Sequence, residues 1–503
     1  MPAFLRPIRS PALDRQQPSP STDQTPGLAA RLFHADFLQP GTKALLFPVE
    51  TISRELDFKL VLAGYCARPG NQIFLGNHTD IYELGKRLRH GLYVGKNVLN
   101  VSPTRLRVCY DDLKQNHCRV IYLDEEGAIF AGGPNDWKED MIRKFDPRWL
   151  NAEDHACAWG TFQEQLYHDL KPACDKNIAL TGHPRFSLCH DRFLPLYQNE
   201  INDLKRQHGK FILVSTNFTR GNFGTGPEYF FKRYHVTPDS PLRSPLIQEF
   251  AYHQQKLAIF IRLVSRLSDS FPDHKIILRP HPSEGHAIYQ AILKYIPRAE
   301  IQVHGSLTAW LRAADALIHC GCTTGIEGWL CGTYVLNYQP LHDERFERRI
   351  PNLVGERCEA EDDVIARLST ALTLEEPPHT TLTPEALALM KSLIDNVEQS
   401  TESFEKLARL VASVEDELPA TTAIASLALF ARRGVSERLK RAIRSRYPRF
   451  IKPWKPRNTY QHQRFPGLDP VVIDSKLAFV SELTGRPLIA KYWSSKLMSV
   501  SCG

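Results

Sequence analysis

Short apolar runs alternate with amphipathic segments along residues 275–338. The runs have the length of buried strands, and the predicted strands are Lys275–Leu278, Glu300–Val303, Ala316–His319 and Thr333–Asn337. Alternation of this kind indicates successive βαβ units and a parallel sheet. The turns 279–284 and 321–325 each follow a strand and open a helix. Because ligands of open α/β sheets bind at the carboxyl ends of strands, these turns predict half of a nucleotide-phosphate site.

The same pattern occurs earlier in the chain. Six runs are predicted strands of a first sheet, namely Ala44–Val49, Gln72–Leu75, Gly91–Val94, Arg119–Leu123, His155–Trp159 and Asn177–Thr181. A second sheet begins with the predicted strand Phe211–Ser215. We therefore expect an α/β fold with two Rossmann-like domains facing a cleft. The expected division is a disordered N-terminal arm over 1–40, a first domain over 41–189, a second domain over 190–380, helices packing back on the body over 381–418, and a basic C-terminal extension with helical character over 419–503.

Composition limits the class of protein. The chain of 503 residues has a formal net charge of +7 and 11 cysteines, with no CxxC pair. Scattered cysteines in odd number argue for a reducing compartment and against a disulfide framework. No apolar run reaches the roughly 18 residues of a membrane-spanning helix, and no apolar secretory leader is seen. We expect a cytoplasmic protein, with His319, Cys320 and Cys322 in a buried strand end rather than in a metal site.

A basic segment lies within the C-terminal extension. Residues 430–457 hold 11 Lys or Arg against one acid, Glu437, with large apolar residues interleaved. Such a segment suits an anionic membrane surface, at about 1 kcal/mol per basic residue near it. A solvated face is the alternative, with nucleic acid as a third interpretation that we do not favour. We expect peripheral contact with the inner membrane surface.

The two turns of the second domain carry the candidates for binding the nucleotide donor, with Glu327 expected to accept ribose hydroxyls or, as the alternative, to be a surface carboxylate. They are Arg279, His281, Pro282, Ser283 and Glu284 in the first turn, Thr323, Thr324, Gly325 and Glu327 in the second, and Asn217 after the strand 211–215. A guanidinium can bind phosphate in a bidentate manner, a histidine can donate a hydrogen bond, and threonines at a helix start can cradle phosphate oxygens. The structural alternatives are an intradomain salt bridge for Arg279, a proline-fixed loop for His281 and an ordinary N-cap for one threonine.

Acidic residues mark the corresponding edge of the first domain. Asp124, Glu125 and Glu126 follow a predicted strand, and clustered carboxylates raise one another's pKa, which suits general acid–base work. A polar turn between two strands explains the same residues equally well. Glu50, at the end of the first strand, is a fourth catalytic candidate. Further candidates near the predicted cleft are Arg54 and Glu55 at the start of the first helix, and His183 and Arg185 at the domain junction. Capping and surface ion pairs are the alternative for the residues of the first helix.

Three segments carry a resemblance to a known family. The segments that carry the resemblance are RPHPSE, AADALIHCGCTTGIEG and PVETISRELDFKLVLAG. The chain resembles the bacterial surface carbohydrate (surface polysaccharide) biosynthesis family over about residues 43–375. More distantly, the chain is similar to CDP-glycerol glycerophosphotransferases and to bacterial sialyltransferases and Kdo transferases, which are GT-B-like and use cytidine-activated donors. Sialyltransferases carry an acidic [DE][DE]G motif, an HP motif and a paired Ser/Thr motif. Glu125-Glu126-Gly127, His281-Pro282 and Thr323-Thr324 occur here in that order.

The resemblance implies a GT-B-like glycosyltransferase of surface polysaccharide assembly, either capsule or lipopolysaccharide. It would move a sugar, such as an acidic Kdo-like or sialic-like residue, from a cytidine nucleotide to a lipid-linked glycan acceptor. Glu125 or Glu126 would then be the catalytic base, the first domain would bind the acceptor, and neither a bound cofactor nor a metal is expected. CTTG replaces the Tyr-Ser-Ser pattern of CDP-glycerol enzymes, which weakens the case for CDP-glycerol phosphotransfer. A UDP-sugar 2-epimerase-like isomerase and a non-catalytic polysaccharide-assembly protein would share the same fold.

Overall fold

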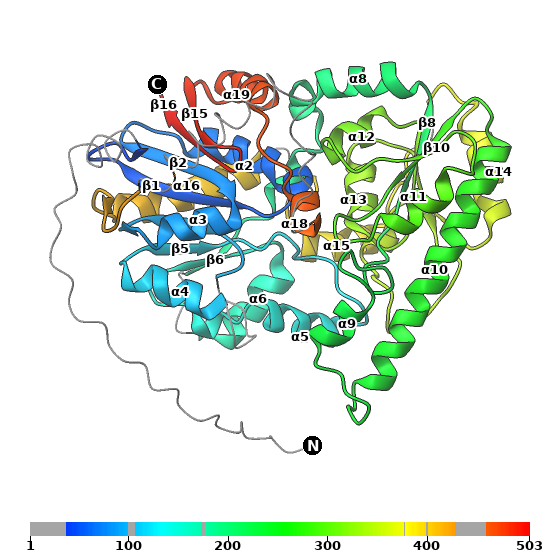
Figure 1. Cartoon of the computed structure of the whole chain (residues 1–503), viewed down its shortest axis with the longest axis horizontal. Coiled ribbons are helices and arrows are strands. Elements are labelled where there is room, and N and C mark those ends of the chain that lie inside the picture. The colour runs from blue at the N-terminus through cyan, green and yellow to red at the C-terminus, as the bar shows by residue number, and fades with distance from the viewer. Residues whose placement is uncertain are drawn as a thin grey trace, which may run out of the picture.

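A computed structural model describes residues 37–98, 106–172, 177–376, 378–398, 401–427, 430 and 459–503. The chain builds two mainly parallel sheets with helices around them, side by side in Figure 1. The first sheet has the strand order β15-β16-β2-β1-β4-β5-β6-β7. Its strands are β1 (Lys43–Val49), β2 (Asn71–Asn77), β4 (Leu92–Gly95), β5 (Arg119–Tyr122), β6 (His155–Ala158), β7 (Ile178–Leu180), β15 (Leu488–Ser494) and β16 (Leu497–Cys502).

The strands from β1 to β7 pair in parallel, and each connection carries the chain back over the sheet. The connecting elements are α2 (Ile52–Cys66), α3 (His78–Gly85), β3 (Leu88–Arg89), α4 (Leu106–Gln115), α5 (Pro134–Lys144), η1 (Pro147–Trp149) and α6 (Thr161–Leu170). After its first residue, β1 is buried throughout. This continuous burial is typical of a parallel strand whose sheet is covered on both faces.

The second sheet is parallel throughout and has the order β10-β9-β8-β11-β12-β13. Its strands are β8 (Phe211–Ser215), β9 (Lys275–Arg279), β10 (Ala299–Ile301), β11 (Ala316–His319), β12 (Val335–Tyr338) and β13 (Glu356–Cys358). The helices around it are α9 (Glu228–Arg233), α10 (Arg243–Ser270), α11 (Ala287–Leu293), α12 (Leu307–Ala313), α13 (Thr323–Leu330), η4 (Pro351–Leu353) and α14 (Glu361–Ala371). The strand order reverses between β8 and β11, which is the topological switch point where ligands of such sheets bind.

The chain crosses between the two sheets more than once. It leaves the first sheet through α7 (Pro184–Ser187), η3 (Asp191–Leu196) and α8 (Gln198–His208). It returns through α15 (Pro384–Leu393) and α16 (Glu402–Asp416). Of these two helices, α15 packs on α6 and α16 packs on α2. β14 (Thr422–Ala423) then pairs with β3. One hydrophobic cluster runs from Phe47 and Leu60 into Leu213 and Trp310, so the two domains share a core.

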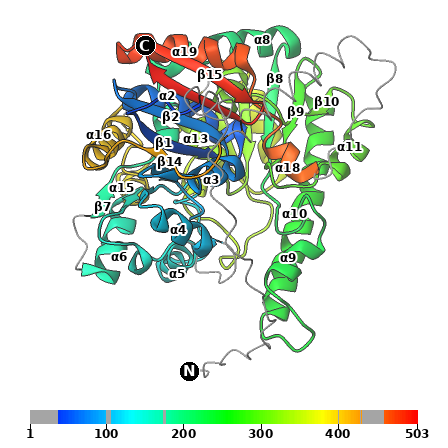
Figure 2. The ribbon, with the colours of Figure 1, turned by 60° about the vertical axis from the view of Figure 1, so that its left-hand side comes forward.

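The C-terminal extension adds to both the interface and the first sheet. α18 (Thr459–Arg464) lies between the two domains, and α19 (Pro470–Thr484) packs on α2 (Figure 1). The hairpin β15–β16 follows, and β16 pairs antiparallel with β2 at the sheet edge. Figure 2 shows the same hairpin beside β2 from another side. These two strands were not expected from the sequence, which indicated a helical and basic extension.

The predicted α/β class with two Rossmann-like domains is confirmed. Two predicted segments fall largely outside the described residues: the N-terminal arm over 1–40, of which 37–40 are described, and the basic segment 430–457, of which Phe430 alone is described. Within the described ranges, no helix is long and apolar enough to cross a membrane. In the same ranges, no cluster of three or more His, Cys, Asp or Glu side chains is arranged to hold a metal ion.

Candidate active site at the carboxyl ends of the two sheets

Arg54 joins the two domains at the carboxyl ends of their strands. It lies in the first turn of α2, which begins soon after β1 ends. Its Nη1 is 3.1 Å from Nε2 of His281, in the turn after β9, and its Nη2 donates to Oγ1 of Thr323 at 3.3 Å, at the start of α13. Glu126, after β5, is 3.8 Å away, from Oε1 to Nη1. The structure therefore brings together four residues that the sequence singled out separately.

The turn that carries His281 fixes the role of its ring. The backbone N–H of Ser283 donates to Nδ1 at 3.1 Å, which places the proton of a neutral imidazole on Nε2. Because a guanidinium can only donate, the contact between Nε2 and Nη1 of Arg54 is then one between two donors. Burial, together with the positive charge of Arg54, holds the pKa of His281 well below its usual range, and the ring is neutral at pH 7. Nε2–H and the Arg54 guanidinium are thus two donors side by side. Both can donate to one oxygen atom of an anion.

The start of α13 completes this group of donors. Thr323 and Thr324 are buried and stand in the first turn, where backbone N–H groups have no intrahelical partner. Gly325 must be glycine, because a Cβ there would collide with the ring of His319 beneath the helix. Arg348 reaches the same end of the helix and donates to the carbonyl of Gly321 at 3.3 Å. Amides, hydroxyls and guanidinium groups here suit a phosphate.

Of the three acids after β5, Glu126 is the one that faces the Arg54 group. Asp124 is buried, and its Oδ1 accepts from the N–H of Glu126 at 3.0 Å, so it shapes the turn. The side chain of Glu126 is 47% exposed. Partial burial raises its pKa, but the positive charges of Lys96, Lys144 and Arg54 outweigh that effect and hold the pKa of Glu126 well below its usual range. Glu126 is therefore a carboxylate at neutral pH, and the raised pKa that the acidic cluster predicted is wrong for this residue.

Glu125 belongs to a second, buried group behind the first. Its Oε1 is 3.2 Å from Nζ of Lys59, and its Oε2 is 3.6 Å from Nε2 of His183. His183 repeats the geometry of His281: its Nδ1 accepts from the N–H of Arg185 at 3.1 Å, which leaves the proton on Nε2. Burial and the nearby Arg185 and Lys59 charges hold the pKa of His183 well below its usual range.

The buried group continues across the domain boundary. Nε of Arg185 is 3.2 Å from Oε1 of Glu327, in the second turn of α13. The sequence suggested ribose contacts for Glu327, whereas its structural partner is a guanidinium of the first domain. Apart from these ion pairs, several buried atoms of this group make no hydrogen bond, among them both carboxylate oxygens of Glu125 and Nε2 of His183. The interface thus contains polar groups with unused hydrogen-bonding capacity.

Glu50 and Glu55 share a cation that the sequence pattern did not reveal. Nζ of Lys96, just after β4, is 3.0 Å from Oε2 of Glu50 and 3.0 Å from Oε1 of Glu55. Burial raises the pKa of Glu50, but the charges of Lys96 and Arg464 lower it to about 2. Glu55 is more deeply buried, and burial raises its pKa. Lys96 therefore links Glu50, just after β1, to Glu55 in the first turn of α2.

Three predicted phosphate-turn residues have other partners. Arg279 donates to the carbonyls of His304 at 2.6 Å and Gly305 at 2.8 Å, away from His281. Glu284 is fully buried and accepts from Thr216 Oγ1 at 2.9 Å and Tyr289 OH at 2.5 Å. The carbonyl of Pro282 accepts from Gln463 at 2.8 Å. These residues hold the turn that presents His281, and the structure does not bring them to the Arg54 group.

A small cavity lies at the switch point of the second sheet, next to the start of α13. It is lined by Asn217, Phe218, His253, Lys256, Cys320, Gly321, Phe346, Glu347, Arg348 and Asn352. Asn217 and Gly321 follow β8 and β11, the two strands at which the order reverses. Nδ1 of His253 and Oδ1 of Asn352 are buried without a hydrogen-bond partner. The cavity is mostly polar, with the rings of Phe218 and Phe346 in its wall, and its volume of about 20 Å³ has room for about one water molecule.

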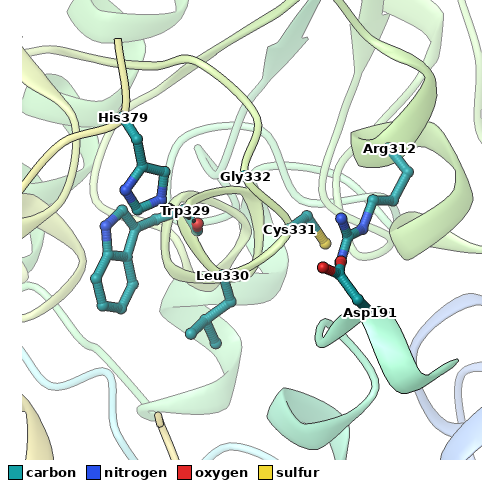
Figure 3. A pocket seen from close by; sticks show the side chains of 7 residues that line it. All are labelled: Asp191, Arg312, Trp329, Leu330, Cys331, Gly332 and His379. Atoms are coloured by element: carbon teal, nitrogen blue, oxygen red, sulfur yellow. Dashed lines mark hydrogen bonds and ion pairs between the residues drawn. The ribbon is translucent and has the colours of Figure 1, made fainter. Parts of the chain in front are cut away.

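A larger cavity of about 250 Å³ lies at the other end of α13 (Figure 3). It is lined by Asp191, Arg312, Trp329, Leu330, Cys331, Gly332 and His379. Its lining residues contact one another: Arg312 pairs with Asp191 at 2.8 Å, and the rings of Trp329 and His379 stack with centroids 5.8 Å apart. None of the predicted site residues lines it.

Sequence reasoning missed the cations that neutralise the acids and the contacts from the extension. Lys59 is a fully buried lysine within an apolar helical run, and its spacing of four from Glu55 was an available signal. Lys96 follows a strand end, which was a second signal. Gln463 and Arg464 gave none, because nothing local connects them with partners that lie 181 and 414 positions earlier in the chain. The switch-point residues His253 and Arg348 also lie in segments without a recognisable motif.

Comparisons with known proteins give no family. No family model matches the chain, and no curated protein matches it. Among solved structures, the wall teichoic acid polymerase TagF is similar at 11% identity over 77% of this chain and 92% of that chain, with a TM-score of 0.46. The UDP-GlcNAc 2-epimerase of Methanocaldococcus jannaschii, in complex with UDP-GlcNAc and UDP, has 10% identity over 74% and 99%, with a TM-score of 0.43. Anabaena HepE in complex with UDP-glucose has 10% identity over 75% and 100%, with a TM-score of 0.36. At these values the likenesses identify neither a family nor an activity.

Proposed function

We propose that the chain is a GT-B-type glycosyltransferase of surface polysaccharide biosynthesis, which transfers a sugar from a cytidine nucleotide to a glycan acceptor. One observation carries the proposal. Arg54 of the first domain meets His281 and Thr323 of the second at the carboxyl ends of both sheets. Donors from two domains that converge on one point suit the phosphate of an activated sugar, and a carboxylate, Glu126, stands beside them.

The chemistry follows from the roles of these groups. The bond between the anomeric carbon and the phosphate oxygen breaks, and negative charge grows on the leaving phosphate. His281 Nε2–H and the Arg54 guanidinium stabilise that charge, because fixed donors act most strongly where charge develops. The acceptor hydroxyl oxygen bonds to the anomeric carbon, and its proton passes to the carboxylate of Glu126. Side-chain cations neutralise the phosphate in this scheme, so a divalent metal is not required.

The nucleoside is proposed to bind at the switch point, over the small cavity, whose volume of about 20 Å³ is too small to enclose a base. The cavity adjoins the start of α13, so a nucleotide with its phosphate at Thr323 and Thr324 would extend toward Asn217 and Asn352. Asn side chains both donate and accept hydrogen bonds, as recognition of a base or a ribose requires. The choice of cytidine rests on the similarity of the HP and paired-Thr motifs to those of cytidine-dependent transferases. The sugar is proposed to be acidic, Kdo-like or sialic-like, on the same basis.

The experiment for this proposal is a thermal-shift series with CMP, CDP, UDP and GDP, because a ligand that binds the native state raises its stability. We expect a larger shift with CMP or CDP than with UDP or GDP. An equal or larger shift with UDP would favour a UDP-sugar transferase or an epimerase-like isomerase. Product analysis then separates the classes: sugar transfer releases a free nucleotide and lengthens a glycan, epimerisation needs no acceptor, and an assembly protein releases nothing.

We further propose that the enzyme works at the cytoplasmic surface of the inner membrane, where lipid-linked acceptors are made. The support is the sequence of residues 430–457, with 11 basic residues against one acid. The test is co-sedimentation of the full-length chain with anionic liposomes at low and high salt. The matched variant replaces these lysines and arginines by glutamine rather than truncating the chain, because truncation would remove β15 and β16. Equal binding of both proteins would contradict the anchor.

A further inference from the structure

Two neighbouring residues of α18, in the C-terminal extension, form hydrogen bonds with the two domains on opposite sides of the candidate site. Nε2 of Gln463 donates to the carbonyls of Pro282 at 2.8 Å and Glu284 at 3.2 Å, in the turn of the second domain. Arg464 points to the first domain, where its Nε donates to Thr51 Oγ1 at 3.0 Å and its Nη1 to Glu50 Oε1 at 2.7 Å. α18 therefore bonds to both domains within two positions.

The bonded groups are the supports of the Arg54–His281 contact. The carbonyls that Gln463 bonds flank the segment in which the Ser283 N–H orients the imidazole of His281. Thr51 is the N-cap residue of α2, and its carbonyl accepts from the N–H of Arg54 at 3.2 Å. Gln463 thus acts on the backbone that presents His281, and Arg464 acts on the start of the helix that presents Arg54.

The rest of the extension fixes α18 to the body of the protein. Phe465 and Leu468 are buried in the core cluster shared by the domains. Farther on, Nζ of Lys476 in α19 is 2.8 Å from Asp57 Oδ1 and 2.7 Å from Glu200 Oε1. With β16 paired to β2, the chain that follows α18 is held by both a helix and a strand. A fixed short helix can set a distance between two other elements, whereas a loose one cannot.

We propose that Gln463 and Arg464 are positioning residues of the anion site, which set the separation and orientation of His281 and Arg54 without contacting the ligand. The C-terminal extension is then a part of the site rather than an appendage. The inference rests on the proposed function only in assigning a phosphate-bearing ligand. Its geometrical content applies to any anion held between His281 and Arg54.

The binding test uses the full-length chain and two probes, CDP and inorganic pyrophosphate. Gln463→Ala and Arg464→Ala should each weaken binding of both probes about tenfold, as expected when a hydrogen bond to a charged group is misplaced. Arg486→Ala is the matched control. Arg486 also comes from the extension and also bonds α2, but at its far end, through the carbonyls of Gly64, Tyr65 and Ala67. It should lower the melting temperature and leave both affinities unchanged.

A double-mutant cycle separates positioning from direct contact. The variant His281→Asn can still accept from the Ser283 N–H but lacks the donor at the position of Nε2. If Gln463 acts through His281, then Gln463→Ala should change affinity less than about twofold in the His281→Asn background. A full tenfold loss there would show that Gln463 acts on the ligand by another route, and would overturn the proposal.

A measurement without ligand covers the case in which neither probe binds, which would count against the proposed function alone. Gln463→Ala should speed hydrogen exchange of the Ser283 and Glu284 amides, and Arg464→Ala that of the first-turn amides of α2, relative to wild type and to Arg486→Ala. Unchanged exchange at both places would refute the positioning role, whatever the ligand is.

Discussion

Arg185 of α7 and Glu327 of α13 form an ion pair across the two domains, 3.2 Å from Nε to Oε1, with side chains only 5% and 4% exposed. Burial lowers the pKa of Arg185, and the negative charge of Glu327 opposes that effect. Each charge therefore depends on the other, because an uncompensated buried charge is costly.

Glu327→Gln should destabilise the protein by about 3–5 kcal/mol, since it leaves the Arg185 guanidinium buried without a counter-charge. The double variant Arg185→Met/Glu327→Leu should lose much less than the sum of the two single losses. The measurement is the midpoint of urea unfolding. Asp203→Ala is the control, because Asp203 pairs with Arg206 on the surface and such pairs contribute about 0–1 kcal/mol. Loss of nucleotide affinity without loss of stability would instead indicate a ribose-binding role for Glu327.

His281→Asn should weaken nucleotide binding by about 1.5–3 kcal/mol, the contribution of a hydrogen bond to a charged group. The apo melting temperature should hardly change, because asparagine can accept from the Ser283 N–H in place of Nδ1. Isothermal titration with CDP, alongside thermal unfolding of the apo protein, checks both statements. A large loss of apo stability with intact binding would show that His281 supports the loop and does not bind ligand.

Glu126→Gln should reduce turnover by about 10²–10⁴ while donor binding and melting temperature survive, as expected for loss of a general base. Glu125→Gln should instead lower stability, because Glu125 is buried against Lys59 and His183. Since the pKa of Glu126 lies well below its usual range, the acid limb of the turnover profile should fall below the pH at which an ordinary glutamate titrates. Turnover of Glu126→Gln within about threefold of wild type would return these acids to a structural role.

Glu50 gives a stability prediction with a defined pH window. Its pKa is about 2 in the folded protein, against 4.5 for an ordinary glutamate, so its ionised form stabilises the fold. The contribution is fully present above about pH 4.5 and is lost as the pH falls toward about 2, because the unfolded chain takes up the proton first. Glu50→Gln should therefore cost up to about 3 kcal/mol at pH 7 and much less at pH 3. Urea unfolding of both proteins at the two pH values measures the difference, and an equal cost at both would contradict the ionic origin.

The sequence predicted the parts of the site that follow from strand ends. Buried parallel strands appear as short apolar runs, and residues directly after them meet at one edge of each sheet. That rule identified Arg54, His281, Thr323 and Glu126 before any contact was known. The same rule was wrong for Arg279, the last residue of β9, because its guanidinium donates to the carbonyls of His304 and Gly305. A strand end fixes where a residue lies, but not toward which neighbour its side chain turns.

The extension could not be predicted by the same reasoning. The alternation along residues 488–502 is weak, and the strongly basic segment 430–457 before it dominates the composition. Even a correct assignment of two strands would not have given β2 as their partner, because register across such a separation leaves no local signal. Gln463 and Arg464 join the site through long-range contacts of this kind. Their positions therefore become meaningful once the tertiary structure is known.

The pairing of β16 with β2 also determines the order in which the sheets can be completed during synthesis. Gln72 and Ser499, which hydrogen-bond at this edge, are 427 positions apart, whereas the whole second sheet lies between Phe211 and Cys358. Since chains fold as they emerge, the second sheet can form completely while β2 still has an unpaired edge. An unpaired edge is a template for joining another strand. The β15–β16 hairpin therefore covers this edge only after the second sheet has been synthesised, and until then the edge of β2 is exposed to misassociation.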